Sequence, residues 1–141
     1  MTPVRDRPFD IERDAYLPLL RDRPLRPLRV EEKAVIATLA QAFDLDRALV
    51  STEALARARV KEMPDGGMGS LRFIRRQGGV HDVGRVTEPL WARDEDDVPV
   101  AFTLFLDEAG QLFELDVWKV DYSPLRRYPR PGDLSPTAPD L

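Results

Sequence analysis

The sequence lacks cysteine and has a single histidine, His81. The absence of cysteine excludes disulfides, a cysteine nucleophile and thiolate metal sites. No apolar stretch approaches the ~20 residues that a membrane-spanning helix needs. The charged residues 1–8 are not followed by the apolar run of a signal peptide. We therefore expect a cytoplasmic protein that does not associate with a membrane.

The chain has 141 residues, a length that fits one domain. Of its 13 prolines, five lie in residues 1–29 and four in residues 126–141. Each proline removes a backbone donor and disfavours a regular helix or an inner strand. We predict a proline-rich N-terminal arm over 1–29, a single α+β domain over 30–125 and a flexible proline-rich tail over 126–141. The arm contains several apolar residues, so we expect it to lie across the domain and cover part of it.

The clearest helical pattern covers residues 30–43, where the apolar residues recur at the spacing of one helix face. Residues 44–54 fit either a loop or a second short helix that begins at an aspartate cap. Residues 55–63 could continue that helix or form the first strand, and their alternation of small apolar and basic residues favours the strand. The five residues that form the apolar face of the first helix are Val35, Ile36, Leu39, Ala40 and Phe43.

The second half of the chain has the alternating pattern of strands. A glycine-rich stretch at 64–70 predicts a turn, and residues 107–110 predict the turn of a hairpin. We predict an antiparallel sheet of about four to five strands, a C-terminal meander packed against one main N-terminal helix. Both strands of the last hairpin also carry apolar residues on their second face, so that face needs cover from the arm, another layer or a partner. The four strands of the meander are expected at 71–76, 86–93, 98–106 and 111–121.

The charge is concentrated in one segment. Residues 88–121 contain ten acidic residues and only Arg93 and Lys119 as basic ones, so the segment carries −8 within a chain of net charge −4. Such a balance favours cationic partners and disfavours nucleic acid. Four of these acids are consecutive and form a predicted turn that we interpret as a contact patch for a basic protein, since the spacing of a calcium-binding loop is absent. They are Asp94, Glu95, Asp96 and Asp97.

No catalytic motif stands out in the sequence. Glu114 and Asp116 are two residues apart on a strand, which places them on the same face as Trp118. Paired carboxylates act as acid and base in glycosidases, but a polar surface beside a large aromatic is equally typical of a protein-binding patch, to which Trp91 would add. His81 has no recognisable nucleophile partner, and the glycines at 66–69 lack the lysine of a phosphate loop. We predict a protein that is not an enzyme and needs no cofactor or metal.

Three stretches resemble an uncharacterised family of small bacterial domains. They are residues 25–33 (LRPLRVEEK), residues 65–73 (DGGMGSLRF) and residues 112–125 (LFELDVWKVDYSPL). The resemblance covers roughly residues 25–125 and implies no established activity. Small acidic bacterial α+β domains of this kind are similar in class to immunity proteins, which are encoded beside antibacterial toxins and neutralise them.

The sequence thus leads to a hypothesis of a non-enzymatic immunity protein that binds a cognate toxin, a basic one if charge guides the contact. The predicted contacts are Asp94–Asp97, Trp91, Glu114, Asp116 and Trp118. The alternative is a small enzyme or ligand-binding domain with a pocket near Glu114, Asp116 and Trp118. A homo-oligomer that buries the second sheet face is a third possibility.

Overall fold

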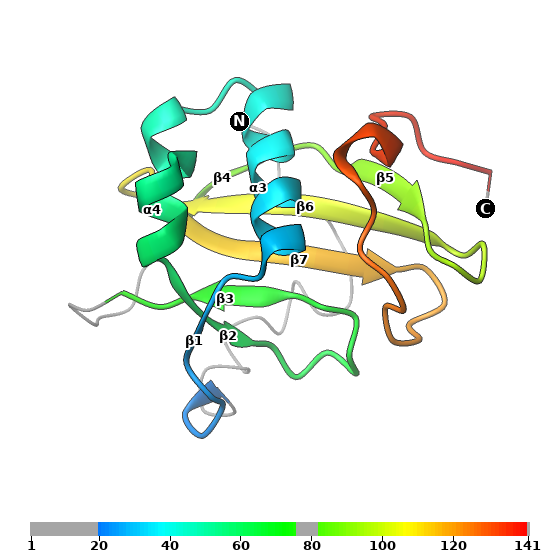
Figure 1. Cartoon of the computed structure of the whole chain (residues 1–141), viewed down its shortest axis with the longest axis horizontal. Coiled ribbons are helices and arrows are strands. Elements are labelled where there is room, and N and C mark those ends of the chain that lie inside the picture. Colours follow the sequence, from blue (N-terminus) through cyan, green and yellow to red (C-terminus); the bar gives the residue numbers. More distant parts are fainter. Residues whose placement is uncertain (1–19, 76–81, 141) are drawn as a thin grey trace.

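The computed structural model describes residues 20–75 and 82–140, which form an α+β fold (Figure 1). One antiparallel sheet has the strand order β1-β2-β3-β7-β6-β4, and β5 also pairs with β6. The central strands β6 and β7 are the longest. The strands are β1 (Arg26–Pro27), β2 (Arg59–Glu62), β3 (Leu71–Phe73), β4 (Val83–Val86), β5 (Leu90–Arg93), β6 (Pro99–Asp107) and β7 (Leu112–Lys119).

The helices and the C-terminal chain lie over one face of this sheet (Figure 1). The main helix α3 (Val30–Ala42) buries Val35, Ile36 and Leu39 completely, as its apolar spacing requires. The shorter helix α4 (Thr52–Arg57) lies beside it, and one-turn 3-10 helices occupy Arg47–Val50 and Pro131–Asp133. Among the described residues, no helix combines the length and apolar character needed to cross a bilayer.

The hairpin of β6 and β7 forms at the predicted place. Its turn is closed by Asp107, whose carboxylate accepts hydrogen bonds from the backbone N–H of Ala109 (2.9 Å) and Gln111 (3.0 Å). Gly110 has a φ of +80°, a conformation that favours glycine. The predicted turn at 64–70 likewise joins two paired strands, β2 and β3, and the carboxylate of Asp65 accepts three backbone N–H groups within it.

The sheet has seven strands, so the prediction of four to five was too low. Residues 86–93, predicted as one strand, contribute to two strands, because Pro89 has no N–H to donate. Between them the backbone N–H of Thr87 bonds to Leu104, and the Thr87 hydroxyl accepts from the Leu104 N–H at 3.0 Å. The other added strand, β1, is only two residues long and lies in the segment predicted as an arm.

The prediction of a strand over 55–63 was only partly right, because residues 52–57 are helical and β2 begins at Arg59. Capping explains the helix. The Ser51 hydroxyl accepts from the backbone N–H of Ala54 at 3.1 Å, and Asp46 caps the preceding 3-10 turn through Ala48 at 3.0 Å. Two side-chain caps thus override a pattern of alternating residues.

The two faces of the central hairpin are both buried but differ in chemistry. Phe102, Leu104, Leu115 and Val117 face α3 and belong to the apolar core. The opposite face carries register pairs that include polar groups, among them Thr103 with Asp116 and Phe105 with Glu114. Of the predicted arm over 1–29, residues 1–19 lie outside the described residues, whereas residues 20–29 include β1, which pairs with β2, and the buried Leu20 and Leu28.

A buried lysine fixes the end of the sheet. The Lys119 side chain is fully buried, and its Nζ donates to Asp94 (2.9 Å), to Asp96 (2.7 Å) and to the carbonyl of Pro124 (3.2 Å). We call these four groups the Lys119 node. Burial lowers the pKa of Lys119, but the hydrogen bonds that its ammonium group donates to Asp96 and Asp94 more than offset this effect, so the pKa lies above its usual value. The node ties β7, the turn after β5 and the chain beyond β7 to one another.

Beyond β7 the chain crosses the helix side of the sheet as a segment, residues 122–135, that we call the C-terminal segment (Figure 1). Asp94 accepts the backbone N–H groups of Arg126 and Arg127, and Ser135 forms an isolated bridge with Trp91 on β5. Part of the predicted tail is therefore packed on the sheet. The boundaries at 30 and 125 stay a prediction.

The Lys119 node should dominate the stability of this end of the sheet. We expect Lys119→Met to lower the free energy of unfolding by about 3 kcal/mol, because it leaves Asp94 buried without its cation. Lys33→Met is the matched control, since Lys33 lies on a half-exposed helix position, and its change should stay within about 0.5 kcal/mol. Urea unfolding monitored by circular dichroism measures both. Equal effects for the two variants would contradict the role of the node.

Candidate functional site

The predicted acidic patch is only partly a surface. Asp94 is 6% exposed and accepts from Lys119 and from three backbone N–H groups, so it is a structural residue. Asp96 is half-buried beside Lys119 and lies 3.4 Å from the Nε of Arg126. Glu95 and Asp97 are exposed. Two of the four predicted contact residues are therefore available to a partner.

The pKa values of the two inner aspartates reflect this arrangement. Burial raises the pKa of Asp94. The hydrogen bonds from the Arg126 backbone and from Lys119 lower it by more, so the net pKa lies below its ordinary value. The hydrogen bond from Lys119 also lowers the pKa of Asp96 below its ordinary value. Both carboxylates stay ionised near neutral pH, in a fixed position that suits structure rather than proton transfer.

Three aromatic rings run along the same end of the sheet. Trp91 and Trp118 meet edge to face with ring centroids 6.2 Å apart, and Trp118 lies 6.4 Å from Tyr122. Trp91 is buried, Trp118 half-buried and Tyr122 48% exposed. Tyr122 also has a φ of +62°, which is uncommon for an aromatic residue. We call this end of the sheet the acidic–aromatic end. Its residues are Trp91, Glu95, Asp97, Trp118, Asp121 and Tyr122.

Glu114 and Asp116 do share a face with Trp118, as their spacing predicts, but both are buried. Glu114 accepts a hydrogen bond from Arg72 at 3.0 Å, and both side chains of this ion pair are almost fully enclosed. The Ser70 hydroxyl lies 3.4 Å from Asp116 and accepts from the Val117 N–H. This face therefore holds a buried polar network, which differs from the open acid–base pair of a glycosidase.

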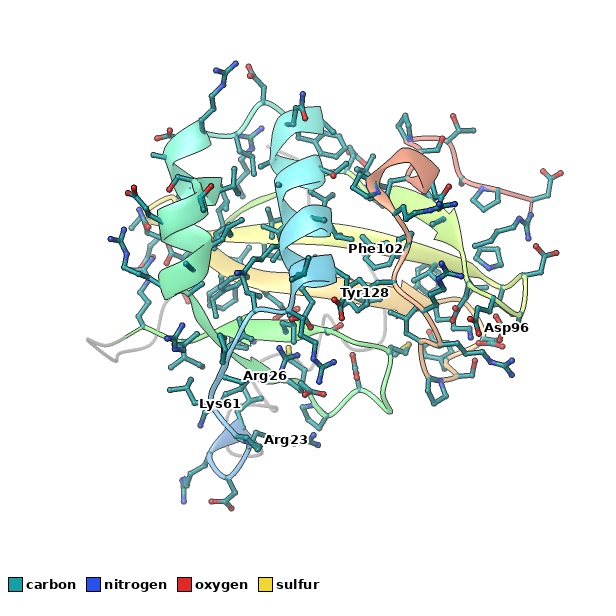
Figure 2. All side chains as sticks on the ribbon, in the orientation of Figure 1. Arg23, Arg26, Lys61, Asp96, Phe102 and Tyr128 are labelled. Atoms are coloured by element: carbon teal, nitrogen blue, oxygen red, sulfur yellow. The ribbon has the colours of Figure 1, made fainter. Side chains whose placement is uncertain are left out.

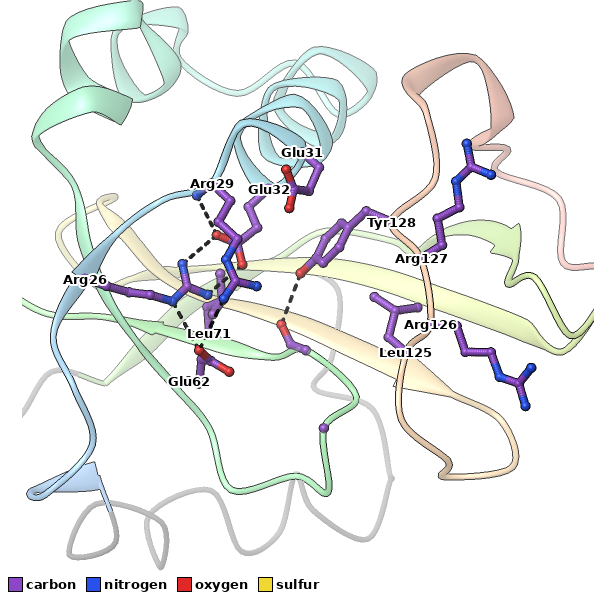
Figure 3. Close-up of a pocket in the computed structure, with 12 residues that line it drawn as sticks. Arg26, Arg29, Glu31, Glu32, Glu62, Leu71, Leu125, Arg126, Arg127 and Tyr128 are labelled. Atoms are coloured by element: carbon purple, nitrogen blue, oxygen red, sulfur yellow. Dashed lines mark hydrogen bonds and ion pairs between the residues drawn. The ribbon is translucent and has the colours of Figure 1, made fainter.

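A hollow of about 460 Å3 lies instead on the helix side, between the start of α3, the glycine turn and the C-terminal segment (Figure 3). We call it the α3 pocket. Its volume is in the range of small-ligand sites. Figure 3 shows Arg26, Arg29 and Glu32 on one side and Tyr128 facing them across the hollow. Its lining consists of Arg26, Arg29, Glu31, Glu32, Glu62, Gly67, Gly69, Leu71, Leu125, Arg126, Arg127 and Tyr128.

An ion pair builds the helix-side wall of the α3 pocket. Arg26 donates to both oxygens of Glu32, at 2.9 and 2.8 Å, and to Glu62 at 3.2 Å. Glu32 also accepts the backbone N–H of Arg29 at 2.7 Å, in the manner of a capping box. Burial raises the pKa of Glu32, but the hydrogen bonds from Arg26 and Arg29 outweigh it and the net pKa is lowered. These contacts join β1 to α3 and to β2.

Tyr128 builds the opposite wall. Its ring packs against Phe102 with centroids 6.0 Å apart, and Figure 2 shows both over the middle of the sheet, away from Asp96. The hydroxyl donates to the carbonyl of Gly69 at 3.3 Å, and burial raises the pKa of Tyr128 well above its usual range. Gly69 has a φ of +106°, and a Cβ there would lie 3.4 Å from the Tyr128 oxygen. The glycine turn thus serves close packing, in agreement with its interpretation as a hairpin turn.

The sequence did not point to the α3 pocket. Glu32 lies near the start of the predicted helix and was not among the predicted site residues, and Tyr128 fell in the predicted tail. A signal for Lys119 was present, since it follows Leu115 and Val117 at alternate positions and so belongs to the core face. His81 lies outside the described residues. In the described ranges, no three carboxylate or imidazole groups gather as a metal site, and the expectation of no cofactor stays a prediction.

Comparisons with known proteins identify a family whose function is unknown. A family model described as "Domain of unknown function (DUF6984)" matches residues 25–129. No curated protein and no solved structure matches the chain. The match spans the three stretches on which the resemblance was based, and it begins and ends beside Arg26 and Tyr128, the two residues that face each other across the α3 pocket.

The lowered pKa of Glu32 predicts how stability depends on pH. A depressed carboxyl pKa adds stability that is complete above the unfolded pKa of about 4.3 and disappears as pH falls through the folded value. Between about pH 6 and about pH 3, Glu32→Gln should therefore lose less unfolding free energy than the wild type does. Glu31→Gln, at the exposed neighbour, should follow the wild type. Urea unfolding at the two pH values measures this difference. If the unfolding free energy of Glu32→Gln fell with pH as much as that of the wild type, the prediction would be refuted.

Proposed function

This chain belongs to the DUF6984 family, and we propose that it is a non-enzymatic protein-binding domain, an immunity protein that neutralises a cognate bacterial toxin by direct contact. The proposal places it in the cytoplasm, where it would meet the toxin. One observation carries it: an aromatic row ends in the exposed ring of Tyr122, next to the exposed Asp121 and at the end of the sheet that also has the exposed Glu95 and Asp97. Aromatic anchors surrounded by polar groups are typical of binding hot spots.

The use of the carboxylates supports a non-enzymatic role. Glu114, Asp94 and Glu32 are each held by a cation and by buried surroundings. A general acid or base needs a pKa near the working pH, whereas the pKa values of Asp94 and Glu32 are shifted downward. The alternative, a pocket near Glu114, Asp116 and Trp118, gains no support from a face on which both acids are buried.

The charge that remains exposed favours a basic partner. Of the ten acids in residues 88–121, four are buried in the fold: Asp94, Asp107, Glu114 and Asp116. Three exposed ones, Glu95, Asp97 and Asp121, belong to the acidic–aromatic end. Complementary charge raises association rates more than it raises affinity. We therefore propose that the acids steer the toxin and that the aromatic rings hold it.

The anchor can be tested with a variant that keeps the backbone. Tyr122→Asn removes the ring, and asparagine tolerates a positive φ. We expect binding to the product of the adjacent gene to weaken by about 2 kcal/mol, or about 30-fold. Leu25→Asn is the control, because Leu25 is similarly exposed and lies at the other end of the sheet. Calorimetry and survival of cells that co-express the toxin measure the effect. Absence of binding by the wild type would overturn the proposal.

Steering can be tested separately through the association rate. We expect Glu95→Gln combined with Asp97→Asn to slow association several-fold at low salt and to leave dissociation nearly unchanged. Glu108→Gln is the control, since Glu108 is an exposed acid in the turn between β6 and β7. Stopped-flow measurements at two ionic strengths give both rates. An association rate equal to that of the control variant would contradict steering by this surface.

A further inference from the structure

The face of the central hairpin that points away from the helices is buried, although it is partly polar. Side chains alternate between the two faces of a strand, so the residues on this second face are those between the core residues of β6 and β7. All of them except Trp118 are at most 3% exposed. The residues of the second face are Ala101, Thr103, Phe105, Glu114, Asp116 and Trp118.

The described helices cover only the other face. Helices α3 and α4 and the C-terminal segment all lie on that side of the sheet (Figure 1). Ser70 and Arg72 contact the second face, but they come from β3 of the same sheet and flank the hairpin. Within residues 20–75 and 82–140, no helix and no second sheet lies over it. Its cover therefore comes from a segment outside these ranges or from another molecule.

The described chain begins on the same side of the sheet as this second face. The carbonyls of Leu20 and Arg21 accept hydrogen bonds from the Nζ of Lys61 on β2, at 3.0 and 3.2 Å, and Figure 2 shows Lys61 near that end of the chain. Lys61 is paired with Arg72 across β2 and β3, and Arg72 is paired with Glu114 across β3 and β7. Directly paired residues of an antiparallel sheet point to the same face. Lys61 therefore points to the second face and holds the start of the described chain there.

Residues 1–19 are long enough to cross the second face from this point. From β2 to β6 the sheet has three strand steps, which amount to roughly 14 Å. A segment of this length spans about 28 Å as a helix and about 60 Å when extended. The other segment outside the described ranges, 76–81, has to join β3 to β4 over the same number of strand steps, which leaves it little length to cover a face.

The composition of residues 1–19 also suits a face that is partly apolar and partly charged. The segment combines large apolar residues with arginines and acids. Apolar side chains gain free energy by burial against Ala101 and Phe105, and charged ones suit the surroundings of Glu114 and Asp116. The large apolar residues of the segment are Phe9, Ile11, Tyr16, Leu17 and Leu19.

From these observations we propose that residues 1–19 of the same chain are the cover of the second sheet face, packed on Ala101, Thr103 and Phe105. A tethered segment has an effective concentration in the millimolar range, which favours it over a second copy of the protein. The sheet is then enclosed by helices on one side and by the N-terminal segment on the other. This proposal goes beyond the proposed function and does not rest on it, because the exposed ring of Tyr122 is a separate feature.

The absence of cysteine allows a labelling test on the full chain. A nitroxide attached through Ala15→Cys lies within about 17 Å of Leu20 along the chain, which places it over β3 to β6 if the proposal holds. Stacked layers pack roughly 10 Å apart, so the label is about twice as far from the helices as from the sheet. We expect the amide NMR signals of Arg72, Thr103 and Glu114 to lose most of their intensity relative to the reduced nitroxide, and those of α4 to keep most of theirs.

Two controls decide what the signal losses mean. A nitroxide attached through Gln41→Cys, at an exposed position of α3, should give the reverse pattern. Labelled chain without nitrogen-15 is also mixed with unlabelled nitrogen-15 chain, and here we expect no loss. Uniformly weak losses with the Ala15→Cys label, or losses centred on the helices, would overturn the proposal. Losses in the mixed sample would also overturn it, because they would identify a second copy as the cover.

The apolar contacts can be tested in the same labelled chain. Phe9→Ser combined with Ile11→Ser should reduce the intensity losses on the sheet at least about twofold, since apolar burial is the main contribution expected to hold the segment. Leu25→Ser combined with Val30→Ser is the control, because both residues are exposed in the fold. Unchanged losses in the first variant, or an equal reduction in the control, would refute these contacts. Toxin binding is measured separately with the unlabelled wild type, so the failure of one proposal leaves the other standing.

Discussion

A single buried ammonium group organises one end of this protein. Lys119 is the last residue of β7. Because side chains alternate between the two faces of a strand, it points to the same core face as Leu115 and Val117. A charge in that position is tolerated only when it is paired and fully hydrogen-bonded. Asp94, Asp96 and the Pro124 carbonyl meet this need. The turn after β5 and the chain after β7 are therefore held where they are because the lysine requires them.

The consequences reach the middle of the sheet. With Pro124 fixed at Lys119 and the N–H groups of Arg126 and Arg127 fixed at Asp94, the C-terminal segment has little choice of path. That path brings Leu125 to the Gly67 carbonyl and Tyr128 to the Gly69 carbonyl. One wall of the α3 pocket is thus a remote result of the ion pair. The other wall depends on its own ion pair, between Arg26 and Glu32.

Features with a local cause could be predicted from the sequence. The helix at 30–43 and the turns at 64–70 and 107–110 follow from apolar spacing and turn residues, and the structure has helix α3 and both turns there. The two-residue strand β1 and the α3 pocket depend on contacts between distant segments. The exposed charge of residues 88–121 could not be predicted for the same reason. Arg72 and Arg75 lie outside this segment and form ion pairs with two of its acids, Glu114 and Asp107. A sum of charges along the chain does not distinguish an acid that faces solvent from one that is paired inside.

The same distinction guides the functional argument. Charged groups used inside the fold, such as Asp94, Lys119 and Glu114, account for the position of the chain and leave little chemistry for a substrate. Among the described residues, what remains for function includes the exposed ring of Tyr122 and the exposed side chain of Glu95. The backbone N–H of Tyr122 donates to the carbonyl of Lys119 at 2.8 Å, and two residues later the Pro124 carbonyl accepts from the Lys119 ammonium group. The contacts that satisfy the buried lysine thus also fix the backbone beside the exposed ring.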